Sequence, residues 1–170
     1  MTIKSCCNED TQMNDDGKIE KSWSCYYTAK QFHKAAGLLD IDPGMFEIDY
    51  YVPHSVVLYF ACELYLKSLL INLDIDFKKT HNLYELFRTL SDKRGDIAES
   101  IFNGCNSVVH SKVINKCVLG KVLRDEGNNF CKFRYSFDES KPLSAHLNVM
   151  IPFISSLEKE CDRIFNHVDS

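Results

Sequence analysis

Three polar residues of this 170-residue chain, His110, Asn106 and Arg134, have side chains that can transfer a proton or bind an anion. His110 has the side chain whose ordinary pKa best suits proton transfer near neutral pH. Asn106 lies four residues earlier on the same helical face, where it can orient the imidazole or hold a phosphate oxygen. Neither supplies a positive charge, and Arg134 can do so only if the fold brings it close. A hydrogen-bonded Asn106–His110 surface pair is the simpler interpretation, and the sequence leaves both open.

A second set of polar residues lies in and just after the most apolar segment of the chain. Glu63 and Lys67 are four residues apart and therefore share one face of a helix. Because a buried charge needs a partner, an internal ion pair explains both residues, and ligand binding is the alternative. His81 either belongs to the start of the next helix or contributes to the same binding site.

Other kinds of site are poorly supported by the sequence. The eight cysteines contain no C-x-x-C pair, and no two of the six histidines are four residues apart, so we predict no metal and no cofactor. Glycine-rich phosphate loops, G-x-S-x-G and H-E-x-x-H motifs are absent. Cys62 and Cys161 fall on apolar helical faces, where a free cysteine acts as a small hydrophobic residue, and this favours a reduced, cytoplasmic protein. The longest apolar stretch, 56–71, carries two charges and is short for a bilayer, so we predict no membrane association.

Charge is distributed unevenly along the chain. The formal net charge is −4, which argues against binding nucleic acid through overall charge. Residues 1–20 carry two lysines and five acids, whereas residues 110–134 carry six basic and two acidic residues. The second segment is either a local basic surface or a solvated loop.

The apolar pattern predicts an all-α fold, a compact bundle of four to five helices around a buried central helix. Residues 1–20 are predicted to form a disordered acidic tail, and residues 21–168 a single helical domain. Leu64 lies in the middle of the central apolar stripe, and Asn82-x-x-Glu85 is typical of a helix start. Pro152 interrupts the last stripe and predicts a kink or two abutting helices. The expected helices span 21–39, 53–71, 82–90, 96–110 and a segment that opens near residue 142, with a short additional helix near 113–123.

Three short motifs, in this order, resemble the HEPN domain family. The segment 60–70, with its Glu63-x-x-x-Lys67 pair, resembles the central helix of that family. Thr80-His81-Asn82-Leu83 is similar to the family's start of the next helix, and Arg134-Tyr135 resembles an Arg-Tyr pair found late in one branch. The resemblance implies a helical bundle, commonly dimeric, with an RNA- or nucleotide-linked role.

The chain departs from the family at the ribonuclease motif, an arginine followed four to six residues later by histidine. The nearest segment, 105–110, keeps Asn106 and His110 but has Cys105 in the arginine position. A metal-independent ribonuclease needs a cation to stabilise the charge on the phosphate, and cysteine cannot supply one.

The resemblance therefore implies two hypotheses. The first is a HEPN-like module that binds RNA, a nucleotide or a protein partner, in a prokaryotic defence or toxin–antitoxin system. The second is a metal-independent endoribonuclease that uses His110, Asn106 and a displaced cation such as Arg134. Glu63, Lys67, His81 and Tyr135 are the expected substrate-binding residues. A homodimer is expected, with an antitoxin or a nucleotidyltransferase as a further partner.

Overall fold

The computed structural model describes residues 15–39, 51–108, 114–134 and 145–166 of the chain. Within these residues the fold is all α-helical and contains no strand, which confirms the predicted fold class. The helices are α1 (Asp15–Leu38), α2 (Tyr51–Asn72), α3 (Leu83–Lys93), α4 (Gly95–Val108), α5 (Lys116–Glu126), α6 (Asn129–Arg134) and α7 (Leu147–Asn166).

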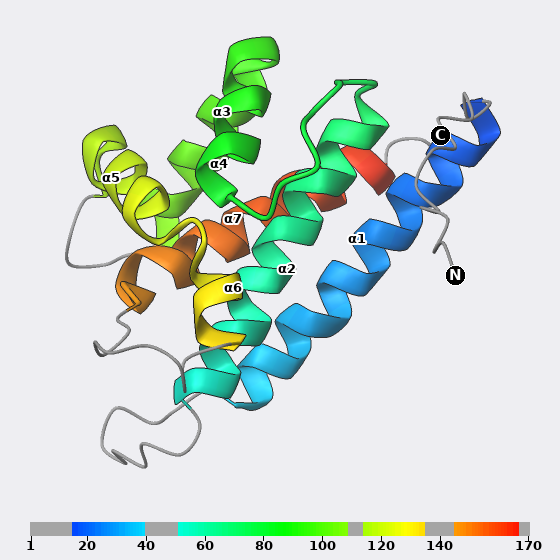
Figure 1. The fold of residues 1–170 in the computed structure, drawn as a ribbon. Helices are drawn as coiled ribbons and strands as arrows, with labels where there is room; N and C mark the ends of the chain where they lie inside the picture. Colours follow the sequence, from blue (N-terminus) through cyan, green and yellow to red (C-terminus); the bar gives the residue numbers. More distant parts are fainter. Residues whose placement is uncertain (1–14, 40–50, 109–113, 135–144, 167–170) are drawn as a thin grey trace, which may run out of the picture.

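Helix α2 is the centre of the bundle, as its apolar circumference predicts. Helices α1, α3, α6 and α7 all pack against it, and Figure 1 shows α2 running through the middle of the molecule. Tyr65, Leu66 and Leu69 of α2 are completely buried. Leu64, the predicted centre of the apolar stripe, is only partly buried, whereas Leu66 is completely buried.

Two helix boundaries and one internal proline bear directly on the sequence predictions. Helix α1 begins at Asp15, which places residues 15–20 in a helix rather than in the predicted tail. The side chain of Asn82 caps α3 by accepting a hydrogen bond from the Glu85 N–H, which confirms the predicted helix start. Helix α7 runs through Pro152 as one helix. The proline is tolerated because the carbonyl that it leaves without a partner belongs to the exposed residue Asn148, where water can bind it.

Two short helices, α5 and α6, occupy part of the segment where the sequence pattern was weak. Asn115 caps α5 through its side chain, which accepts a hydrogen bond from the Val118 N–H. Helix α6 has only six residues but buries Phe130 and Phe133 against the core. The described part of the basic segment, residues 114–134, is therefore packed onto the bundle. Figure 1 shows α5 and α6 on the side of α2 that faces away from α1.

Helix α2 is long and apolar enough to cross a membrane by length and composition alone. About two thirds of that apolar window, 67%, is buried inside the fold. This burial is typical of a core helix in a bundle, because a helix that crosses a membrane would expose its apolar side chains on the outside of the protein.

Candidate functional site

The buried carboxylate of Glu63 gathers two other residues that the sequence singled out. Glu63 is 1% exposed, and Lys67 Nζ lies 2.7 Å from its Oε1. His81 Nδ1 approaches both carboxylate oxygens, at 2.9 and 3.1 Å. An isolated buried carboxylate would be very costly, and these two donors satisfy it. The structure therefore brings together Glu63, Lys67 and His81, whose role in binding stays a prediction.

His81 presents the outward-facing end of this ion-pair cluster. Its side chain is 54% exposed, although the Glu63 carboxylate that it contacts is buried. When Nδ1 carries the hydrogen that Glu63 accepts, Nε2 is left as the acceptor on a neutral ring. A histidine held in this way can accept a proton or, when protonated, bind an anion through Nε2.

Phe130 of α6 connects His81 to Arg134. One contact of the Phe130 ring is a stack on Phe60 of α2, with centroids 4.8 Å apart and planes 14° apart. The His81 ring lies 5.8 Å from the Phe130 centroid, and the Arg134 guanidinium carbon lies 5.2 Å from it. An exposed histidine and an exposed arginine thus rest on one buried ring. We call Glu63, Lys67, His81, Phe130 and Arg134 the His81–Arg134 site.

Two aromatic residues near Arg134 pack into the core. Phe130 and Phe133 are buried and anchor α6 to the core, so they are not available to stack nucleic-acid bases. Phe137 lies outside the described residues. The Phe130 ring instead contacts the Arg134 guanidinium, and the electron-rich face of an aromatic ring attracts such a cation.

The residues expected to form the catalytic site are only partly visible. His110 and Tyr135 lie outside the described residues. Asn106 is on the last turn of α4, and its Oδ1 is buried without a hydrogen-bond partner. Helix α4 packs on α3 and α7, whereas α6, with Arg134, packs on α2. The catalytic roles of His110, Asn106 and Arg134 stay predictions.

Cys105, which the resemblance aligns with the arginine of the ribonuclease motif, is a core residue. Its thiol is fully buried and donates a hydrogen bond to the Ile101 carbonyl, with an Sγ–O distance of 3.2 Å. Burial raises the pKa of Cys105 to about 11, which keeps the thiol neutral at physiological pH. This neutral side chain can supply neither a cation nor a reactive thiolate.

A second buried carboxylate, Glu126, was not singled out from the sequence. It accepts hydrogen bonds from the Tyr59 hydroxyl, from His146 Nδ1 and from the His146 backbone N–H, the last at 3.0 Å. Burial is the main reason that the pKa of Tyr59 is raised, and the Glu126 carboxylate adds to it. Glu126 thus joins α2 and α5 to the start of α7, which is a structural connection.

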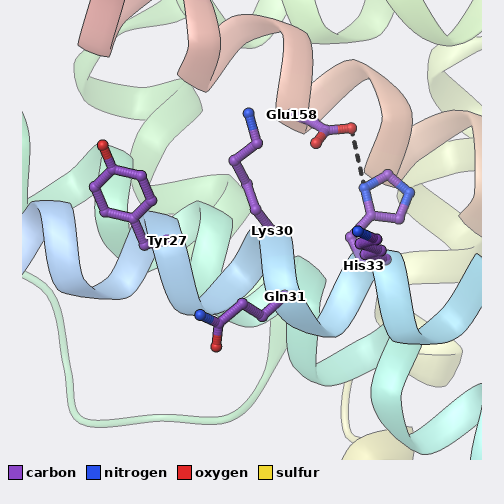
Figure 2. A pocket seen from close by; sticks show the side chains of 6 residues that line it. Tyr27, Lys30, Gln31, His33 and Glu158 are labelled. Atoms are coloured by element: carbon purple, nitrogen blue, oxygen red, sulfur yellow. Dashed lines mark ion pairs between the residues drawn. The ribbon is translucent and has the colours of Figure 1, made fainter.

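A pocket of about 520 Å³ lies between α1 and α7, lined by Tyr27, Lys30, Gln31, His33, Lys34 and Glu158 (Figure 2). Its positive groups are largely neutralised by acids of α7. Lys30 Nζ lies 3.0 Å from Asp162 Oδ1, and His33 Nδ1 lies 3.1 Å from Glu158 Oε2. The hydrogen bond from His33 lowers the pKa of Glu158, which stays ionised. For an anionic ligand, this pocket is less favourable than the His81–Arg134 site.

Residues 44–117 match the family model of the HEPN domain. The match covers somewhat less than half of the chain and includes α2, α3 and α4, with the Glu63–Lys67–His81 cluster. Over these residues the chain is similar to a HEPN domain, and the all-helical bundle is consistent with that similarity. No curated protein and no solved structure shows a significant similarity to the chain.

The match to the HEPN domain suggests a nucleotide- or RNA-related module. Within the described residues, no group of three or more histidine, cysteine or acidic side chains is placed to hold a metal ion.

Proposed function

We propose that the chain is an RNA- or nucleotide-binding HEPN module and that the His81–Arg134 site binds a phosphate group. The main support for this proposal is that His81 and Arg134, two exposed groups able to contact an anion, pack on the same buried Phe130 ring. Arginine forms two parallel hydrogen bonds with a phosphate, and a protonated histidine adds a third donor. The buried Glu63 fixes the orientation of His81, so less order has to be imposed when the ligand binds.

Fluorescence anisotropy with a labelled RNA oligonucleotide tests this proposal. Arg134→Gln removes one positive charge from the site, and Lys132→Gln removes the same charge two residues away on α6. Loss of a charged hydrogen-bonding partner should weaken binding by roughly tenfold for Arg134→Gln. Lys132→Gln should change the dissociation constant by less than about twofold, the effect of general electrostatics alone. Equal effects of the two variants would contradict a localised site.

A metal-independent ribonuclease is the second candidate function, and the Glu63–His81 pair favours it. A carboxylate that orients a histidine is a common arrangement in general acid–base catalysis. Cleavage of RNA by the purified protein should then fall at least about tenfold in His81→Gln or His110→Ala, because acid–base groups typically contribute a hundredfold or more. RNA binding without any cleavage would leave the binding module as the function.

The biological setting belongs to the same proposal. HEPN-like chains are expected to dimerise, and a two-fold pair is the commonest homo-oligomer. We propose a cytoplasmic homodimer that acts in a prokaryotic defence or toxin–antitoxin system, with an antitoxin or a nucleotidyltransferase as its partner. Light scattering at high protein concentration tests the dimer, and a strict monomer would contradict it.

A further inference from the structure

A second cluster of positive charge lies on the exposed surface of α3 and α5. The Arg88 guanidinium carbon lies 5.9 Å from the centroid of the Tyr84 ring, and that of Arg124 lies 5.0 Å from it. Arg124 also donates a hydrogen bond to the Tyr84 hydroxyl at 3.3 Å. We call these three residues the Arg–Tyr–Arg cluster.

The two positively charged guanidinium groups both pack on the Tyr84 side chain. Neither forms an ion pair with a carboxylate of the described residues, although Asp125 and Asp92 are close enough to influence the cluster. The hydrogen bond from Arg124 lowers the pKa of Tyr84, so the phenol experiences a net positive environment. Like charges that are gathered in this way repel one another, and a bound anion relieves that repulsion.

The Arg–Tyr–Arg cluster is joined to the His81–Arg134 site by a close packing contact. The Leu83 N–H donates a hydrogen bond to the Gly127 carbonyl at 3.0 Å. A Cβ atom at position 127 would lie 2.8 Å from Asn82 Oδ1 and 3.1 Å from Tyr84 N, so only glycine allows this approach. The first turn of α3 therefore lies directly against the turn between α5 and α6.

On either side of the Leu83–Gly127 contact, residues of one segment pair with residues of the other. Tyr84 faces Arg124, which precedes Gly127 by one helical turn. His81 faces Phe130, which follows Gly127 by three residues. The two positively charged sites are thus at opposite ends of one contact between α3 and the α5–α6 turn.

We propose that single-stranded RNA binds along this contact, with one phosphate at the His81–Arg134 site and another at the Arg–Tyr–Arg cluster. This inference rests on the proposed function and specifies its ligand as an oligonucleotide rather than a mononucleotide. Phosphates of one strand recur at regular intervals, so two fixed cationic points select a chain over a single nucleotide. A guanidinium group that packs on an aromatic ring can donate hydrogen bonds to a phosphate from the edge of its plane. Its outer face can at the same time stack on an unpaired base.

The test uses two double variants of the full chain that remove equal charge from the same two helices. Arg88→Gln with Arg124→Gln removes the cluster, and Lys93→Gln with Lys121→Gln removes exposed lysines of α3 and α5. Binding of AMP, of an eight-nucleotide single-stranded RNA and of the corresponding duplex is measured by competition at several salt concentrations.

We expect the arginine double variant to bind the single-stranded RNA at least about tenfold more weakly, with AMP binding unchanged within twofold. The slope of log affinity against log salt should decrease by roughly 0.7 for each lost phosphate contact. The lysine double variant should retain most of the affinity. Equal losses in the two double variants, equal losses for AMP and RNA, or a preference for the duplex would overturn the inference.

A further pair of variants separates binding from stability. Tyr84→Phe keeps the ring and should preserve RNA binding, whereas Tyr84→Ala releases both guanidinium groups and should weaken it several-fold. If thermal melting falls in Tyr84→Ala while RNA affinity does not, the cluster only connects α3 to α5 and the inference fails. If Arg134→Gln has no effect but the arginine double variant does, the proposed His81–Arg134 site fails instead.

Discussion

Replacement of Glu63 by glutamine removes the charge from the buried carboxylate that holds Lys67 and His81. Each hydrogen bond to a charged group contributes about 1.5–3 kcal/mol when it is well formed. The side chains of Lys67 and His81 are 20% and 54% exposed, so water replaces part of what each one loses. The glutamine oxygen also still accepts one hydrogen bond. We therefore expect a loss of about 2 kcal/mol in the free energy of unfolding, well below the sum of two full bonds.

Urea denaturation followed by circular dichroism measures this loss, with an unchanged dependence on urea concentration as the sign of two-state behaviour. In a chain of this size, a loss of 2 kcal/mol lowers the melting temperature by about 4–8 °C. Glu99→Gln is the matched control, because it removes the same charge from the exposed Glu99–Lys116 pair, which should contribute at most about 1 kcal/mol. A Glu63→Gln effect no larger than the control would refute the reasoning that this carboxylate holds its partners in the fold.

Three further predictions concern the core, a close contact and pH. Leu66→Ala should lower the free energy of unfolding by about 2–5 kcal/mol, because the side chain is completely buried, and a loss below about 1 kcal/mol in urea denaturation would mean that the core is elsewhere. Gly127→Ala should destabilise the protein and weaken RNA binding together, because its Cβ would lie 2.4 Å from the Leu123 carbonyl oxygen, and a wild-type melting temperature would contradict this contact. The pKa of Glu158 is lowered by its hydrogen bond with His33, so its contribution to stability is present above the ordinary value of 4.5 and is lost as the pH falls through the folded pKa. Urea midpoints at pH 6 and pH 4 should therefore differ less in Glu158→Gln than in the wild type.

The sequence predicted those parts of the fold that depend on local pattern. The apolar circumference of α2 predicted its central position, and Asn82 with Glu85 predicted the start of α3. Leu64 packs against the core but is only partly buried, because several apolar stripes overlap on α2 and periodicity alone cannot rank their burial. Helix α6 was missed because six residues are too few to show a helical period, and its stability comes from packing of Phe130.

The sequence predicted several residues of the candidate site but not the contacts between them. The spacing of Glu63 and Lys67 was enough to predict one shared face, and the ion pair follows from it. The contact of His81 with Glu63 spans 18 residues, and Arg134 contacts the Phe130 ring that His81 also contacts. The Arg–Tyr–Arg cluster depends on α3 lying against α5, a tertiary contact that the basic composition of residues 110–134 did not reveal.

The Phe130 ring also has a consequence for motion at the His81–Arg134 site. Because one ring carries both polar groups, any rotation or displacement of α6 moves the surfaces under His81 and Arg134 together. The two groups are therefore expected to fluctuate in a correlated way, and a ligand that immobilises one of them lowers the entropy lost when the other is ordered. Phe130→Leu, which keeps an apolar side chain but no flat face, should uncouple the two, so that their contributions to binding become additive in a double-mutant cycle.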